Sequence, residues 1–151
     1  MAMIQGAQER NRLLVRGESF SFETVFSDNK GDKLQFLATA KEQGYFVVLL
    51  FVGLDSPQKS RDRVTARVRR GGHDVPTEKI FARYPRVIEN AREGVRVASL
   101  ALLVDNSIDS IDPEQPSYAA FAIYANGELI EQDADIPDWA DGFGLNINQQ
   151  N

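Results

Sequence analysis

The sequence contains no cysteine and a single histidine. Without cysteine the chain can form neither disulfide bonds nor thiolate metal sites, and one histidine is too few for an ordinary zinc centre. A bound metal would therefore need oxygen ligands. The sequence singles out no residue as a metal ligand.

Long apolar runs are also absent. The longest one, residues 45–54, has about half the length that a membrane-spanning helix needs. The N-terminus also lacks the apolar core of a signal peptide. These absences lead us to expect a cytoplasmic protein that makes no membrane contact.

The remaining composition is that of an ordinary globular protein. The chain has 151 residues, of which 42% are apolar and 26% are charged. A chain of this length and composition can bury one substantial core. We therefore expect residues 1–151 to form a single domain.

Charge is unevenly distributed along the chain. The formal net charge is -5, which argues against nucleic acid as a partner, because phosphate backbones bind to net-basic surfaces. Nevertheless, six of the 17 lysine and arginine residues lie between positions 59 and 70. This local concentration favours a small anionic ligand over a nucleic-acid duplex.

Helix-like and strand-like segments alternate through most of the chain. Apolar spacing and end signals predict helices at residues 2–16, 30–43, 57–70 and 76–92. Strands are predicted at residues 19–25, 46–52 and 99–104. The stretch 46–52 has no polar interruption, which is typical of a parallel strand covered by helices on both faces.

The C-terminal third predicts a different local arrangement. A proline-containing linker at residues 107–117 is followed by two strand-like stretches, 118–124 and 128–132. Asn126 and Gly127 between them are a strong signal for an antiparallel hairpin. A short helical turn is predicted at residues 137–140. Together the elements predict an α/β fold with three layers: a mostly parallel sheet flanked by helices, with a helical lid at 57–92 and this terminal hairpin.

Polar residues gather where the predicted strands end. In a mostly parallel sheet, ligands bind beyond the carboxyl ends of the strands. A candidate cleft therefore lies at this edge. The residues that the prediction places there are Glu23, Thr24, Asp55, Ser56, Asp105 and Asn106.

The segment 61–76 contains five arginines, the Gly71–Gly72 pair and a new helix start at Pro76. Arg63, Arg67 and Arg70 lie at helical spacings of four and three, so they share one face. The pattern fits a mobile surface that grips phosphate. It fits equally a solvated helix face whose back is packed through Val64 and Val68.

Five separated motifs resemble the zeta toxin family of P-loop kinases, and they occur in the same order. They are FET at 22–24, VGLDSP at 52–57, the stretch from Arg67 to Pro76 with GGHDVP, RY at 83–84, and VDNS at 104–107. The resemblance covers residues 7–107. It implies a P-loop kinase fold, ATP and magnesium as cofactors, and phosphorylation of a nucleotide sugar such as UDP-N-acetylglucosamine.

The resemblance also implies roles for single residues. Glu23 corresponds to a substrate-positioning acid, with Thr24 beside it in the substrate site. Arg67 corresponds to the catalytic lid arginine that neutralises the transferred phosphate. Nucleotide or lid contacts are implied for Arg70, His73, Arg83, Asp105 and Asn106.

Simpler structural roles stay open for several of these residues. Glu23 is also explained by a salt bridge to a nearby arginine. His73 lies in a polar, glycine-flanked turn, where helix capping or simple exposure would account for it. Asp105 and Asn106 are typical of residues that cap the turn after a strand.

The family's phosphate-binding loop has no counterpart, because neither GxxxxGKS nor GxxxxGKT occurs in the sequence. The catalytic aspartate that follows this loop in the family also has none. We therefore expect a truncated or degenerate kinase domain that does not transfer phosphate as this chain. The alternative is a non-catalytic module that binds an anion or a protein, such as an antitoxin.

The missing loop has a structural consequence. The strand that precedes it lies centrally in P-loop sheets, so its absence would leave an apolar strand edge unpaired. The sequence thus predicts either self-association of the chain or a rearranged sheet.

Overall fold

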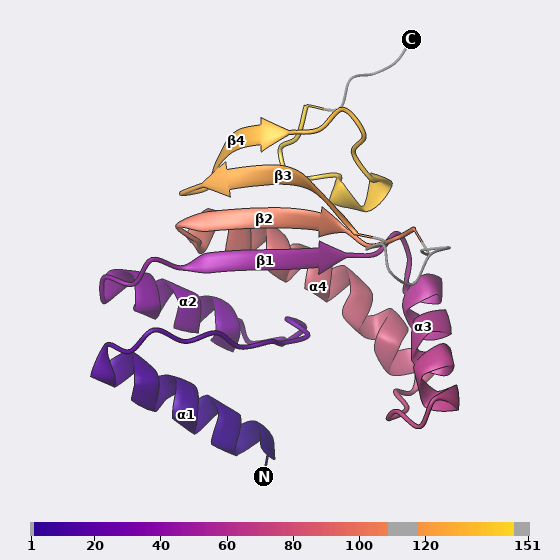
Figure 1. Ribbon diagram of the computed structural model, residues 1–151, viewed down its shortest axis with the longest axis horizontal. Coiled ribbons are helices and arrows are strands. Elements are labelled where there is room, and N and C mark those ends of the chain that lie inside the picture. Colours follow the sequence, from indigo (N-terminus) through magenta and orange to yellow (C-terminus); the bar gives the residue numbers. More distant parts are fainter. Residues whose placement is uncertain (1, 109–117, 147–151) are drawn as a thin grey trace.

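The computed structural model describes residues 2–108 and 118–146, and leaves out the side chains of residues 2–5. The predicted linker therefore lies mostly outside the described residues. In chain order the elements are α1 (Ala2–Arg16), α2 (Asp32–Glu42), β1 (Val48–Gly53), α3 (Pro57–Arg69), α4 (Thr77–Val97), β2 (Leu100–Asp105), β3 (Ala119–Ala125), β4 (Glu128–Gln132) and the short helix η1 (Asp138–Ala140). Figure 1 shows their arrangement.

The described strands form one mixed sheet in the order β1-β2-β3-β4. Only β1 and β2 are parallel, whereas β3 is antiparallel to both of its neighbours. The predicted three-layer, mostly parallel sheet of the P-loop kinase type is therefore wrong. The physical reason is the connections, since only β1 and β2 are joined through helices and the tight β3–β4 turn permits only antiparallel pairing.

Residues 19–25 do not form the predicted strand. They are extended, but no backbone hydrogen bond joins them to another described segment. Figure 1 shows them between α1 and α2, running in the same direction as β1. Alternation of phenylalanine with small polar residues specified an extended backbone, but a strand also needs a neighbour that pairs with it.

Helix α3 begins and ends at the residues that the sequence marks. Ser56 caps α3, and its Oγ accepts a hydrogen bond from the Lys59 amide at 3.3 Å, with Pro57 as the first helical residue. Gly71, with φ of +87°, ends α3 in a left-handed conformation that suits glycine. Helix α4 runs to Val97, five residues beyond its predicted end.

The sheet is covered on one face. Helix α4 packs against β1 and β2, and Figure 1 shows it passing behind them. The C-terminal segment completes this layer through Trp139 and Phe143, whose rings contact Phe51 of β1. This layer and the sheet face beneath it form the main core.

The other face of β1 is open. Val48, Leu50 and Val52 are 56%, 61% and 48% exposed, while Phe51 is buried on the opposite side. The prediction that helices cover this strand on both faces is therefore wrong. An uninterrupted apolar run cannot by itself distinguish a doubly buried strand from one with an apolar face in solvent.

The predicted hairpin is confirmed. Strands β3 and β4 pair antiparallel around Asn126 and Gly127, which have φ of 49° and 82°. Two consecutive residues with positive φ form the type of turn that follows the twist of the strands. In the part of the chain that the structure describes, no helix has the length and apolarity needed to cross a membrane.

Candidate functional site

A cavity of about 280 Å³ lies between the carboxyl end of β1 and the α3–α4 hairpin. Its walls are mainly apolar side chains from five parts of the chain. They come from the extended segment (Val25), β1 (Val52), α3 (Val64) and the turn between α3 and α4 (Val75), and helix α4 adds a fifth part with Ile80, Val87 and Ile88. The cavity thus combines segments that are far apart in sequence.

Two arginines also line this cavity, Arg67 from α3 and Arg83 from α4. No aspartate or glutamate in the described part of the chain lines it. None of the ion pairs between described residues involves either arginine. Among the described residues, neither of these two positive charges of the cavity is in an ion pair with a carboxylate.

The turn after α3 determines how Arg67 is held. Its Nη2 donates a hydrogen bond to the backbone carbonyl of His73 at 3.0 Å. A β-carbon at Gly72 would lie 2.5 Å from Cγ of Arg67, so this position needs glycine if the turn is to pack on the arginine stem. The glycine pair thus provides close packing as well as the helix end.

Tyr84 connects α4 to the end of β1 on the wall of the same cavity. Its hydroxyl donates a hydrogen bond to the Leu54 carbonyl at 2.7 Å. Burial raises the pKa of the Tyr84 hydroxyl, and the negative charges of Asp55 and Asp105 raise it further. Tyr84 is therefore a neutral donor at physiological pH. Its hydrogen bond to Leu54 holds this wall of the cavity in place.

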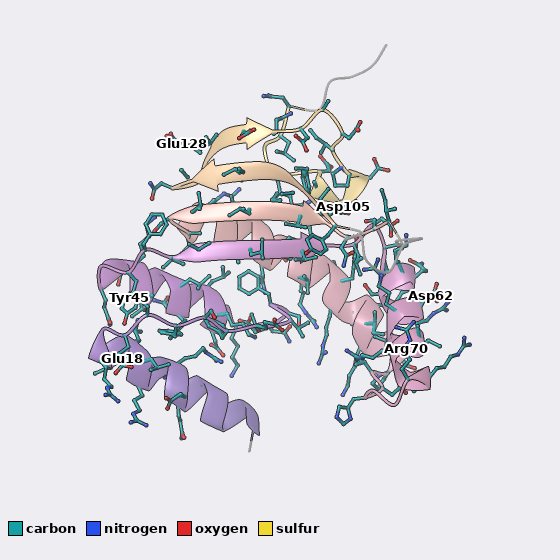
Figure 2. All side chains as sticks on the ribbon, in the orientation of Figure 1. Glu18, Tyr45, Asp62, Arg70, Asp105 and Glu128 are labelled. Carbon is teal, nitrogen blue, oxygen red and sulfur yellow. The ribbon has the colours of Figure 1, made fainter. Side chains whose placement is uncertain are left out.

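Of the predicted lid and nucleotide residues, Arg67 and Arg83 come together at the cavity, whereas Arg70 and His73 are not among its lining residues. Arg70 is exposed at the C-terminal end of α3, and Figure 2 shows it far from Asp105 at the sheet edge. His73 is exposed, and its backbone carbonyl holds Arg67. The surface interpretation of the His73 side chain thus agrees with its position.

Glu23 and Thr24 are exposed next to Val25, the one residue of their segment that lines the cavity. The Thr24 hydroxyl accepts a hydrogen bond from the Phe26 amide at 3.4 Å. Glu23 is in none of the ion pairs between described residues, so the salt bridge considered for it is not formed there.

Asp105 has a structural role. Its Oδ1 accepts hydrogen bonds from Trp139 Nε1 at 2.8 Å and from Ser107 Oγ at 2.5 Å. The backbone amide of Asn106 donates a hydrogen bond to the Gly53 carbonyl at 3.0 Å. The two residues shape the turn after β2 and attach η1 to it, in agreement with turn capping, and neither lines the cavity.

The sequence interpretation missed the contributions of Val25 and Tyr84. Each is adjacent to a residue that it did select, Thr24 and Arg83. Adjacency is a weak signal, however, because tertiary packing decides which of two adjacent residues faces the cavity. Among the described residues, no cluster of three histidine, aspartate or glutamate side chains could hold a metal ion.

Comparisons with known proteins add little about function. No protein-family model matches the chain, and no solved structure matches it. A curated protein of Haemophilus influenzae (strain ATCC 51907 / DSM 11121 / KW20 / Rd), described as uncharacterized, is 34% identical over 65 residues. The similarity covers 43% of this chain and 45% of that protein.

Proposed function

We propose that this chain is a non-catalytic module that binds a small phosphorylated ligand, such as a nucleotide or nucleotide sugar, in the cavity between β1, α3 and α4. The observation that carries the proposal is the pair of arginines, Arg67 and Arg83, on a cavity that no carboxylate of the described residues lines. Arg67 is exposed and Arg83 is half-buried, so an anion that enters the cavity can reach both side chains. Two positive charges at one cavity attract such an anion.

The chemistry of arginine favours phosphate as the anionic group. A guanidinium offers several N–H donors in a planar arrangement that matches two phosphate oxygens at once. Arg67 also belongs to the lid motif of the zeta toxin resemblance, whose implied ligands are ATP and nucleotide sugars. These two arguments are independent, since the first uses geometry and charge and the second uses sequence.

The apolar walls indicate the rest of the ligand. Val25, Val64 and Val75 offer contact to a ring or another weakly polar group beside the phosphate. A volume of about 280 Å³ lies just below the usual range of roughly 300–1,000 Å³ for ligand sites. The site therefore suits part of a nucleotide, with the remainder in solvent.

The proposal does not include phosphate transfer. Transfer depends mainly on positioning the reacting phosphate and on stabilising its charge, for which kinases use a phosphate-binding loop and magnesium. The sequence has no GxxxxGKS or GxxxxGKT loop. Arginines at the cavity would then bind a phosphate group without activating it.

Isothermal titration calorimetry tests this proposal, with ATP plus magnesium and UDP-N-acetylglucosamine titrated separately into the purified chain. We expect one of them to bind, and Arg67→Ala and Arg83→Ala each to weaken binding about tenfold or more, as expected for a lost charge-assisted hydrogen bond. Arg69→Ala is the matched control, since Arg69 is exposed on the same helix and does not line the cavity. Absence of heat with both ligands would refute the proposal, as would an equal loss in all three variants.

A further inference from the structure

The outer edge of β1 is an unpaired strand edge. Among the described strands, β1 is at the end of the sheet and pairs only with β2. The carbonyls of Val47 and Gly53 accept hydrogen bonds from the β2 side, from Leu100 and Asn106. Because the backbone groups of successive residues point to alternate sides of a strand, the groups of residues 48, 50 and 52 point away from β2.

A second unpaired backbone lies beside this edge. Residues 18–26 run in the same direction as residues 45–54 (Figure 1), and the two stretches share a hydrogen bond at one end and a cavity at the other. At one end the hydroxyl of Tyr45 donates to the Glu18 carbonyl at 3.2 Å, and Figure 2 shows these two residues close together. At the other end Val25 and Val52 line the same cavity. No backbone hydrogen bond joins the two stretches.

We propose that β1 and residues 18–26 form a docking site for one extended, uncharged apolar strand that another polypeptide supplies. The incoming strand would pair its backbone with the free N–H and C=O groups of Val48, Leu50 and Val52. Such strand addition gains affinity from backbone hydrogen bonds and specificity from alternate side chains. It would make β1 an inner strand of a five-stranded sheet.

The chemistry of the edge specifies the occupant. Residues 43–54 carry no charge, and the exposed side chains of Val48, Leu50 and Val52 form an apolar row. An incoming strand with charges in its centre would lose their hydration without finding a partner. The edge also has no lysine, proline or bulge, the usual features that prevent strand addition. β1 is six residues long, so the occupant needs about six residues as well.

A second copy of this chain is a poorer occupant. Its own apolar edge strand is again β1, and that strand is flanked by its own residues 18–26. Pairing two copies through β1 would therefore bring residues 18–26 of each copy against the sheet of the other. A single strand from a different polypeptide avoids this conflict.

Hydrogen exchange measured by NMR tests the proposal directly. In the dilute chain, we expect fast exchange for the amides of Val48, Leu50 and Val52, and slow exchange for those of Leu49 and Phe51. The probe is a synthetic peptide of alternating valine and isoleucine, six residues long, with two lysines at each end. Its addition should slow the three fast amides, whereas the same peptide with N-methyl groups on every second residue should not slow them.

Leu50→Pro provides a second test. Its N–H points away from β2, so proline is tolerated there as at other edge positions but removes a donor needed by the incoming strand. We expect peptide binding about tenfold weaker in Leu50→Pro and unchanged in Leu50→Thr, which keeps the backbone donor. Circular dichroism checks that both variants fold. If Leu50→Pro does not fold, the hydrogen-exchange experiment on the unmodified chain decides whether the proposal holds.

Three results would overturn the proposal. The first is slow exchange of all three amides in the dilute chain without peptide. The second is a failure of the peptide to bind or to slow them. The third is protection that increases with protein concentration together with a dimer in sedimentation, which would identify a second copy as the occupant. None of these results depends on anion binding at Arg67 and Arg83, so the two proposals fail separately.

Discussion

At the scale of single residues, similar side chains near the sheet edge have different roles because their neighbours differ. Asp105 accepts hydrogen bonds from Trp139 and Ser107, so its carboxylate is used in holding the turn after β2. Arg67 has a backbone carbonyl as its described partner and lines the cavity. Both residues are polar and lie near a helix or strand end, yet the one is structural and the other available to a ligand.

Gly53 is the residue where we expect a small substitution to have a large effect. A β-carbon at this position would lie 2.3 Å from Cζ2 of Trp139, a ring packed between Phe51 and Phe121. Overpacking of this kind typically costs about 1–3 kcal/mol. Chemical denaturation of Gly53→Ala should show a loss of unfolding free energy in this range.

The control for this prediction is Gly6→Ala. Gly6 is in α1, and its added β-carbon would meet only the end of the Arg10 side chain, at 3.7 Å. This substitution should be neutral or slightly stabilising, since alanine favours helix more than glycine does. If both variants have the stability of the unmodified chain, the close packing of Trp139 on β1 is wrong.

At the scale of elements, the α3–α4 hairpin is the part that connects stability to the proposed binding site. It is attached to the sheet through α4, while α3 has no fully buried residue. The N-terminal cap at Ser56 is therefore a large part of what specifies where α3 begins. Helix α3 carries Arg67, so a change at the cap can reach the cavity.

Ser56→Ala should lower the unfolding free energy by about 1 kcal/mol, because the Lys59 amide loses its hydrogen bond to the serine hydroxyl. Ser56→Asp should keep most of the stability, since aspartate is an equally good cap. Denaturant unfolding of the two variants measures the difference. Equal stability of Ser56→Ala and the unmodified chain would mean that this cap does not stabilise α3.

At the scale of the whole molecule, the buried Tyr124 and the half-buried Tyr84 predict instability at alkaline pH. Burial raises the pKa of Tyr124 to about 12, and its hydroxyl donates to the Phe143 carbonyl at 2.9 Å. Burial and nearby carboxylates raise the pKa of Tyr84 as well. In the unfolded chain both hydroxyls would lose their protons near pH 10.

The sign follows from proton linkage. Below pH 10 both states keep the tyrosine protons, so the stability contribution is complete. Above pH 10 the unfolded state loses protons that the folded state retains, so the unfolding free energy falls up to about pH 12 for Tyr124. Denaturant unfolding between pH 8 and 12 measures this fall, which should be smaller in Tyr124→Phe. An identical pH dependence in this variant would show that Tyr124 is not the titrating group.

The sequence by itself determined most of the local structure. Glycine at helix ends, Ser56 followed by Pro57, and Asn126 followed by Gly127 act over a few residues, so the helices and the hairpin were predictable from them. The cluster of arginines on an acidic chain also marked Arg67, whereas Arg83 was implied only by the zeta toxin resemblance. Their meeting at one cavity depended on how α3 packs against α4.

Only the tertiary structure decided which segments become neighbours. Local pattern made residues 19–25 extended, but pairing depends on a partner strand, and none of the described strands forms backbone hydrogen bonds with them. The same holds for β1, where an apolar run specified a strand without indicating that its edge and one face stay open. Strand order, coverage of the sheet and the contents of the cavity depend on contacts between distant residues, which local sequence patterns do not encode.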